Sequence, residues 1–156
     1  MNLLPGWAPN VHPLLVHFPI ALLITAVVLD AAGLALRRHT LLRHAATLLY
    51  VLGTGALVAA YVTGRAASET IWLPGMAHAV VAEHWDWAFR TLWFFGSVTV
   101  VRVVLLRPSR RDPRPAIVAA LALAGLVGIG LLVTTGDRGG RLVYQHGVGT
   151  AREQGR

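Results

Sequence analysis

The sequence predicts an all-α integral membrane protein, a bundle of four membrane-spanning helices that forms one domain over residues 1–156. Composition is the first observation behind this prediction. Hydrophobic residues make up 55% of the chain and charged residues only 13%, whereas soluble domains carry about 25% charged residues. The second observation is a set of four apolar runs, each long enough to cross roughly 30 Å of hydrocarbon as a helix. They cover residues 13–36, 41–63, 87–106 and 116–135.

The first run follows an uncharged stretch, since no residue before Asp30 carries a charge. A secretory signal peptide has a basic first region and a small-residue cleavage site. Neither is evident, so we expect a retained helix. Pro13 suits the first turn of that helix, and His12 should cap it or lie just outside it. Pro19 removes one backbone hydrogen bond, so we expect a kink near His17.

Glycine and alanine mark the helix contacts in the other three runs. Gly53 and Gly55 interrupt the second run and Gly96 the third, while small residues recur at every fourth position of the last run, at Ala120, Ala124 and Gly128. Small residues allow helices to approach closely in lipid. We therefore interpret these positions as packing contacts rather than as space for a cofactor. No convincing internal repeat is evident in the sequence.

The distribution of arginine predicts the orientation of the bundle. The chain carries a net charge of +7 without any lysine, and arginines cluster in segments 37–44 and 107–115. The positive-inside rule places both segments in the cytoplasm. Both termini and a loop over residues 64–85 are then expected on the outer, periplasmic side. Nucleic-acid binding is not expected, because the arginines flank apolar runs instead of forming a basic stripe.

Five of the seven histidines fall on the predicted outer side: His12, His17, His78, His84 and His146. A histidine in a membrane segment is a candidate functional residue, and neutral imidazole binds haem iron, copper and zinc. His17 lies roughly 7 Å deeper than His12 and about 140° around the helix from it. We expect His17 to be buried and to pair with His84, with His146 as the substitute ligand. For His12 and His78, a hydrogen-bonded place at the membrane interface is the simpler interpretation.

Three arginines near the same level are candidate contacts for a cofactor carboxylate: Arg90, Arg138 and Arg141. Guanidinium groups bind carboxylates in a bidentate manner. Anchoring at the membrane edge or a local ion pair explains these arginines equally well. Asp30 and Arg102 lie toward the predicted cytoplasmic ends of their helices, where snorkelling or mutual pairing accounts for both.

The preferred function on these observations is a membrane-embedded electron carrier with a b-type haem held by two histidines. The chain has no cysteine, which excludes disulfides, thiolate metal sites and covalent c-type haem attachment. One alternative is a structural or assembly subunit of a larger membrane complex without its own cofactor. Another is an outer-face copper or zinc site built from His17, His84 and His146. Each alternative favours a carrier or accessory subunit over a stand-alone enzyme.

Two terminal motifs, NVHPLLVHFPIALL and GGRLVYQHGVG, resemble a family of small bacterial membrane proteins catalogued as domain of unknown function two-two-three-one. The resemblance covers nearly the whole chain and implies a multi-pass protein of the bacterial inner membrane, in contact with lipid and with a redox partner or a larger complex. Some members resemble fusions to Rieske-type iron–sulfur domains, although this chain lacks the cysteines such a cluster needs. A homo-oligomer is compatible with the sequence. The motif positions that carry over are His12, Pro13, His17, Phe18, Pro19, His84, Gly140, Tyr144, His146 and Gly147.

Overall fold

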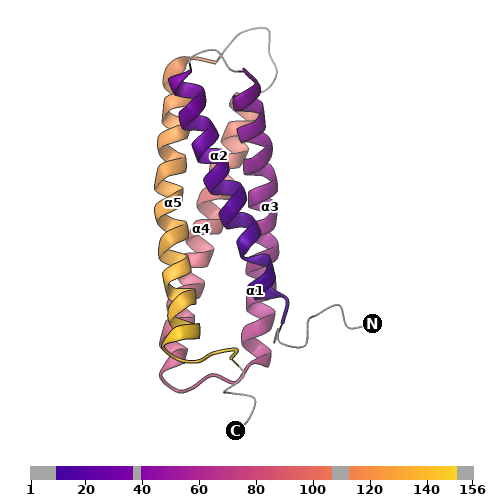
Figure 1. The fold of residues 1–156 in the computed structure, drawn as a ribbon, viewed down its shortest axis with the longest axis vertical. Helices are drawn as coiled ribbons and strands as arrows, with labels where there is room; N and C mark the ends of the chain where they lie inside the picture. The colour runs from indigo at the N-terminus through magenta and orange to yellow at the C-terminus, as the bar shows by residue number, and fades with distance from the viewer. Residues whose placement is uncertain (1–9, 37–39, 107–112, 151–156) are drawn as a thin grey trace, which may run out of the picture.

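The computed structural model describes residues 10–36, 40–106 and 113–150, which form five helices. Two of them, α1 (His12–Leu15) and α2 (His17–Ala35), together make the first span. The other spans are α3 (Thr40–Thr70), α4 (Ala77–Leu105) and α5 (Pro115–Tyr144). All four spans are long and apolar enough to cross a membrane, which confirms the predicted all-α class and the four spanning segments (Figure 1).

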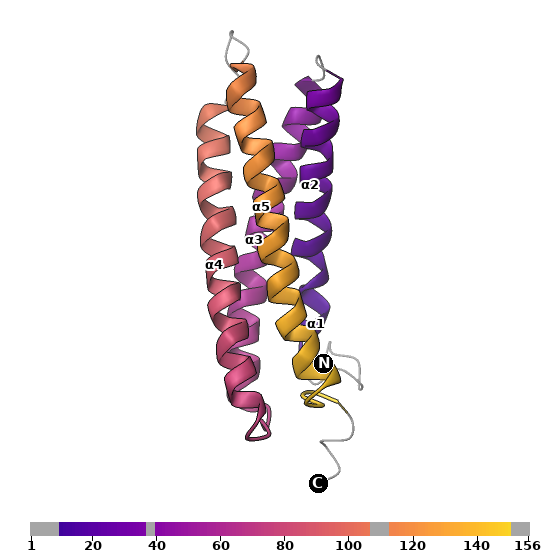
Figure 2. The same ribbon diagram turned by 90° about the vertical axis from the view of Figure 1, so that its left-hand side faces the viewer.

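The spans stand at the corners of an up-and-down bundle. α2 packs against α3 and α5, and α4 packs against the same two helices. Thus α2 and α4 occupy one diagonal of the bundle, and α3 and α5 occupy the other (Figures 1 and 2). We call the end that holds α1, the α3–α4 connection and the last turn of α5 the terminal end, and the opposite end the loop end. Which membrane face each end meets stays a prediction from the arginine distribution.

The first span is broken at Val16, which separates α1 from α2. Pro19 explains the break, because it has no N–H to donate to the carbonyl one turn earlier, at Leu15. The predicted kink near His17 is therefore confirmed. The span starts with His12 inside the helix, and the His12 backbone N–H donates to the Asn10 side-chain oxygen at 2.9 Å.

The remaining helices are longer than predicted. α3 continues to Thr70 and α4 begins at Ala77, so the predicted loop over residues 64–85 is wrong, and the connection spans residues 71–76. α5 likewise continues to Tyr144. The extensions of α3 and α4 contain alanine and glutamate, which favour helix, so each helix is longer than its apolar run. The extension of α5 contains Gly136, Gly139 and Gly140, so helix propensity does not account for it. Helices of 29 to 31 residues reach about 45 Å, well beyond the hydrocarbon core.

The two halves of the chain repeat one another at an offset of 72 residues, a feature that the sequence interpretation missed. α2 buries Pro19, Leu23, Ala26, Val27 and Asp30. Besides Ala77 at its start, α4 buries the residues 72 positions later, Thr91, Phe95, Val98, Thr99 and Arg102. Between α3 and α5 the buried counterparts are Tyr50 and Ala122, Gly53 and Gly125, and Ala60 and Leu132.

This correspondence defines two equivalent units, the N-terminal hairpin (α1 to α3) and the C-terminal hairpin (α4 and α5). Because equivalent helices stand on opposite corners, a pseudo-two-fold axis runs along the centre of the bundle. Residues on that axis meet their own counterparts. In membrane proteins built from repeats, binding sites commonly lie at the interface between the repeats.

Glycines allow the equivalent core side chains of the two hairpins to pack closely. A Cβ at Gly53 would lie 2.7 Å from Leu23 Cγ, and one at Gly128 would lie 2.5 Å from Phe95 Cζ. Leu23 and Phe95 are counterparts, and both are fully buried. Glycine on the neighbouring helix therefore makes room for the same core position in each hairpin.

Candidate functional site

Two histidines from equivalent positions come together inside the terminal end. His12 begins α1 and His84 lies in the second turn of α4. Both side chains are half-buried, and His84 lies within electrostatic range of His12. Since α1 and α4 come from the two hairpins, this histidine pair straddles the pseudo-two-fold axis.

The hydrogen bonds of the two imidazoles fix their tautomers. His84 Nδ1 lies 3.0 Å from the carbonyl oxygen of Thr135, which can only accept, so Nδ1 is the donor. His12 Nδ1 lies 3.4 Å from Thr63 Oγ1. The Thr63 hydroxyl already donates to the Ala59 carbonyl at 2.8 Å, so its oxygen accepts from His12. In a neutral imidazole with a protonated Nδ1, Nε2 keeps the free lone pair, which is the form that binds metals.

Each imidazole also lies against a glycine of the neighbouring helix. A Cβ at Gly64 would approach His12 Cε1 to 2.9 Å, and one at Gly139 would approach His84 Cε1 to 3.3 Å. The hydrogen-bonding partners Thr63 and Thr135 stand 51 residues after their histidines in both hairpins. The two histidines thus have partners at equivalent positions, although His12 bonds the Thr63 side chain and His84 bonds the Thr135 backbone carbonyl.

The other predicted histidines lie elsewhere. His17 and His78 are exposed, and His146 is half-buried in the turn that follows α5. The expectation that His17 is buried is wrong, because His12 faces the bundle interior and the rotation between them turns His17 outward. Among the described residues, no group of three or more histidine, cysteine or acidic side chains could hold a metal ion. The structure therefore does not assemble His17, His84 and His146 as one ligand set.

The predicted arginines gather around the tryptophans of α4. The Arg138 guanidinium pairs with Asp137 at 3.0 Å and approaches Glu83 at 3.8 Å. It also lies 5.8 Å from the ring centre of Trp87, and the Arg90 guanidinium lies 5.0 Å from the same ring centre. Arg141 is exposed and pairs with Asp137 at 3.0 Å.

Arg65 is a further cation at this level, and it was not predicted. Its guanidinium lies 4.0 Å from the ring centre of Trp85, the residue after His84. Arg65 directly follows Gly64, and Arg138 directly precedes Gly139. Since those glycines contact the two imidazoles, one arginine from α3 and one from α5 flank the histidine pair. Arg65 could have been identified from its position in the sequence, because it directly follows Thr63 and Gly64, the two residues that lie against His12.

A second buried polar cluster lies toward the loop end. Arg102 donates two hydrogen bonds to the carboxylate of Asp30, through Nη1 to Oδ2 at 2.7 Å and through Nη2 to Oδ1. Its Nε donates to Thr47 Oγ1 at 3.1 Å, and its guanidinium lies 4.6 Å from the ring centre of Tyr50. Both charged residues are buried, at 1% and 3% exposure. The predicted mutual pairing of Asp30 and Arg102 is confirmed.

Tyr50 fills the centre of this cluster. Its side chain is fully buried, and its hydroxyl lies beside the Asp30 carboxylate without a hydrogen bond of standard geometry. A Cβ at Gly125 would clash with that hydroxyl. Asp30 follows His12, and Arg102 follows His84, by the same interval of 18 residues, about 27 Å at helical rise. The histidine pair and the ion pair are thus separated along the bundle by nearly the thickness of a hydrocarbon core.

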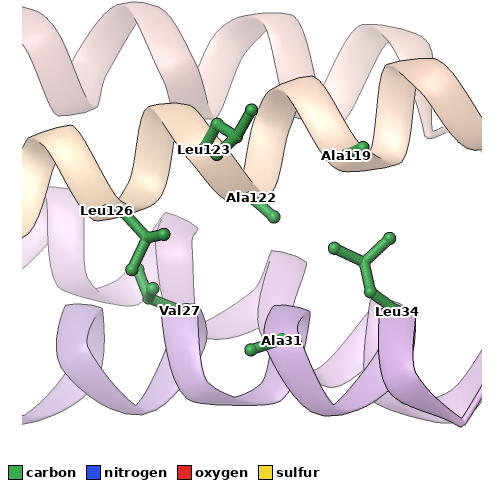
Figure 3. A pocket seen from close by; sticks show the side chains of 7 residues that line it. All are labelled: Val27, Ala31, Leu34, Ala119, Ala122, Leu123 and Leu126. Carbon is green, nitrogen blue, oxygen red and sulfur yellow. The ribbon is translucent and has the colours of Figure 1, made fainter.

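An apolar groove opens between α2 and α5 beside the ion pair (Figure 3). Ala122, on its floor, is the counterpart of Tyr50, so the groove forms where the second hairpin lacks the large side chain of the first. The lining contains only carbon side chains and offers no group for coordination or acid–base chemistry. Its lining residues are Val27, Ala31, Leu34, Ala119, Ala122, Leu123 and Leu126.

Comparison with known families agrees with the terminal motifs. A family model described as Predicted membrane protein (DUF2231) matches residues 8–152. The chain belongs to this family. The match covers both terminal motifs, all four spans, the histidine pair and the ion pair, and a protein of this family contacts the lipid bilayer. No curated protein and no solved structure matches the chain. The description of DUF2231 gives a membrane location without an activity, so a function has to be argued from the residues.

Proposed function

We propose that this member of DUF2231 is an electron-transfer protein of the bacterial inner membrane that holds a b-type haem between His12 and His84. A haem bound by two histidines exchanges single electrons without changing its protein ligands. The observation that carries the proposal is the pair of half-buried imidazoles at equivalent positions of the two hairpins, each with Nδ1 within hydrogen-bonding distance of the next helix of its own hairpin. The terminal end is then the outer end, where an electron would pass between haem and a partner protein or membrane acceptor.

The donor set suits haem chemically. Haem iron accepts two axial imidazoles, and the chain has no cysteine for covalent attachment. Hydrogen bonds from Nδ1 orient ligand histidines and raise their basicity, and Thr63 and the Thr135 carbonyl supply these bonds. A planar cofactor with equivalent faces also suits a site on a pseudo-two-fold axis. Cofactor sites in helical bundles are built from side chains on facing helices in this way.

Cations near the histidine pair suit the carboxylates of a haem. Arg65 and Arg138 stand beside the glycines that contact the imidazoles. Both guanidinium groups already lie near tryptophan rings, so their positions are partly organised before any ligand binds. Guanidinium binds carboxylate through two parallel hydrogen bonds. His146, Arg90 and Arg141 are weaker candidates, because none of them directly adjoins a glycine that lies against His12 or His84.

A zinc or copper site and a subunit without a cofactor would each use His12 and His84 differently. A zinc site needs three or four protein ligands, and the described residues contain no such group. A subunit without a cofactor gives no role to two histidines at equivalent positions of membrane-spanning helices, where ionisable side chains are usually functional. Both considerations favour haem over copper, zinc or an empty scaffold.

An absorption spectrum of detergent-purified protein from haem-replete cells tests the proposal. We expect a Soret band in the oxidised protein and sharp α and β bands after reduction with dithionite. A colourless protein that still forms a folded helical bundle after incubation with haem would contradict the proposal. Elemental analysis of that colourless protein would separate a copper or zinc site from a scaffold.

A further inference from the structure

The two hairpins present similar inner faces to each other. Counterpart residues at the 72-residue offset form the buried faces of α2 and α4, and buried counterparts also recur on α3 and α5. A bundle of two similar hairpins has an alternative assembly, in which a hairpin pairs with the same hairpin of a second copy of the chain. A pseudo-symmetric inner face is self-complementary in shape, as the interface of a two-fold dimer is.

The inner faces differ in charge at one buried level. Position 30 is an aspartate and its counterpart at position 102 is an arginine. These two side chains meet across the diagonal between α2 and α4, which puts them at the position where each hairpin faces its counterpart. Their exposures of 1% and 3% leave no contact with solvent to weaken a charge interaction at this level.

We infer that the Asp30–Arg102 pair decides which hairpins assemble, so that an N-terminal hairpin accepts only a C-terminal hairpin. Pairing of two N-terminal hairpins would place two Asp30 carboxylates against each other inside the membrane. Pairing of two C-terminal hairpins would oppose two Arg102 guanidinium groups. Like charges opposed in a buried interface suppress wrong partners, and a single buried polar pair can fix the choice of partner in helical assemblies.

The surrounding residues support this role more than a catalytic one. Arg102 donates hydrogen bonds to Asp30 and Thr47, and its guanidinium lies against the ring of Tyr50. On the opposite corner, Ala119 and Ala122 replace Thr47 and Tyr50. The polar side chains around Arg102 therefore all come from the N-terminal hairpin, so the arginine finds its partners only when its own C-terminal hairpin packs against that one.

Charge reversal in the full-length protein tests the inference. Asp30→Arg opposes two arginines within one chain, and Arg102→Asp opposes two aspartates. We expect each variant alone to yield less than a tenth of the monomer that the wild type yields in detergent. When the two variants are expressed together with different tags, each N-terminal hairpin finds a complementary C-terminal hairpin in the other chain. We expect a complex with both tags and twice the monomer mass.

The matched control is co-expression of two differently tagged copies of Asp30→Arg, in which every available pairing opposes two arginines. No complex is expected there. A wild-type yield of monomer from either single variant would overturn the inference. So would failure of the mixed pair to form a complex, or formation of the same complex by the Asp30→Arg control, because each shows that charge does not select the partner hairpin.

Discussion

His12 and His84 occupy the same position in two copies of one structural unit, and both donate from Nδ1 to a residue 51 positions further along the chain. Both rings are thereby held against the neighbouring helix of their own hairpin. A single histidine in a membrane segment has many explanations, but two at equivalent positions of a structural repeat are typical of a binding site.

Thr63→Val should weaken haem binding while the fold persists. The valine keeps the size of the side chain but cannot accept the His12 Nδ1–H, so the imidazole loses its orientation. Loss of such a supporting hydrogen bond lowers metal affinity by about 10- to 100-fold, measurable by titration of the apoprotein with haem. Thr134→Val is the matched control, because the Thr134 hydroxyl donates to the Gly130 carbonyl within α5. Equal affinities in the two variants would contradict the assigned role of Thr63.

Gly64→Ala should displace the His12 ring. Its Cβ would lie 2.9 Å from His12 Cε1, closer than carbon atoms pack, so the ring has to move away from Thr63. We expect a loss of haem affinity of about tenfold or more, because ligand orientation depends on the same contact. Gly55→Ala on the same helix is the control, since a Cβ there meets nothing within 4 Å. A haem spectrum unchanged by Gly64→Ala would show that His12 is not held as described.

Asp30→Asn should destabilise the bundle strongly. It leaves the buried Arg102 charge without its partner, a change that costs about 3–5 kcal/mol in proteins. Asp137→Asn removes a carboxylate whose ion pairs with Arg138 and Arg141 are exposed, and such pairs contribute only about 0–1 kcal/mol. The free energy of unfolding, measured by titration of mixed micelles with denaturing detergent, should separate the two variants. Similar losses for both would mean that the buried pair adds no more than a surface pair.

Gly125→Ala should destabilise the bundle through Tyr50, and Tyr50→Phe should restore part of the loss. The added Cβ collides with the Tyr50 hydroxyl and approaches Val27 Cγ2 to 2.8 Å, and overpacking of this kind costs about 1–3 kcal/mol. Tyr50→Phe alone should be nearly neutral, because the buried hydroxyl makes no standard hydrogen bond. Additive effects in the double variant, measured by the same unfolding titration, would rule out the contact.

The sequence predicted the four spans because hydropathy and length determine which segments can cross a bilayer. It did not predict that α3 would reach Thr70 or that α4 would start at Ala77. The residues that extend these helices include polar ones, so the length of an apolar run is shorter than the helix that contains it. The break at Val16 followed from Pro19, a residue whose backbone chemistry acts locally. Local rules therefore gave the spans and the break, whereas helix ends required the tertiary fold.

The candidate site was only partly predictable. Five histidines were predicted to lie on one side of the membrane, and depth along the chain favoured His17 among them, whereas the structure leaves His17 exposed and His12 half-buried. The rotation of a short helix before a proline break cannot be read from hydropathy. The repeat was missed because few counterparts are identical, among them His12 and His84, Gly53 and Gly125, and Thr63 and Thr135. Burial, rather than identity, makes the repeat visible.

The most direct test of the central claim compares haem binding by the wild type with that of three alanine variants, His12→Ala, His84→Ala and His17→Ala. Spectra of the reduced proteins after haem titration report the number of histidine ligands. Low-spin α and β bands are expected for the wild type and His17→Ala, and their loss is expected in His12→Ala and His84→Ala. Low-spin bands retained by His12→Ala and lost in His17→Ala, or no haem bound by the folded wild type, would contradict the claim.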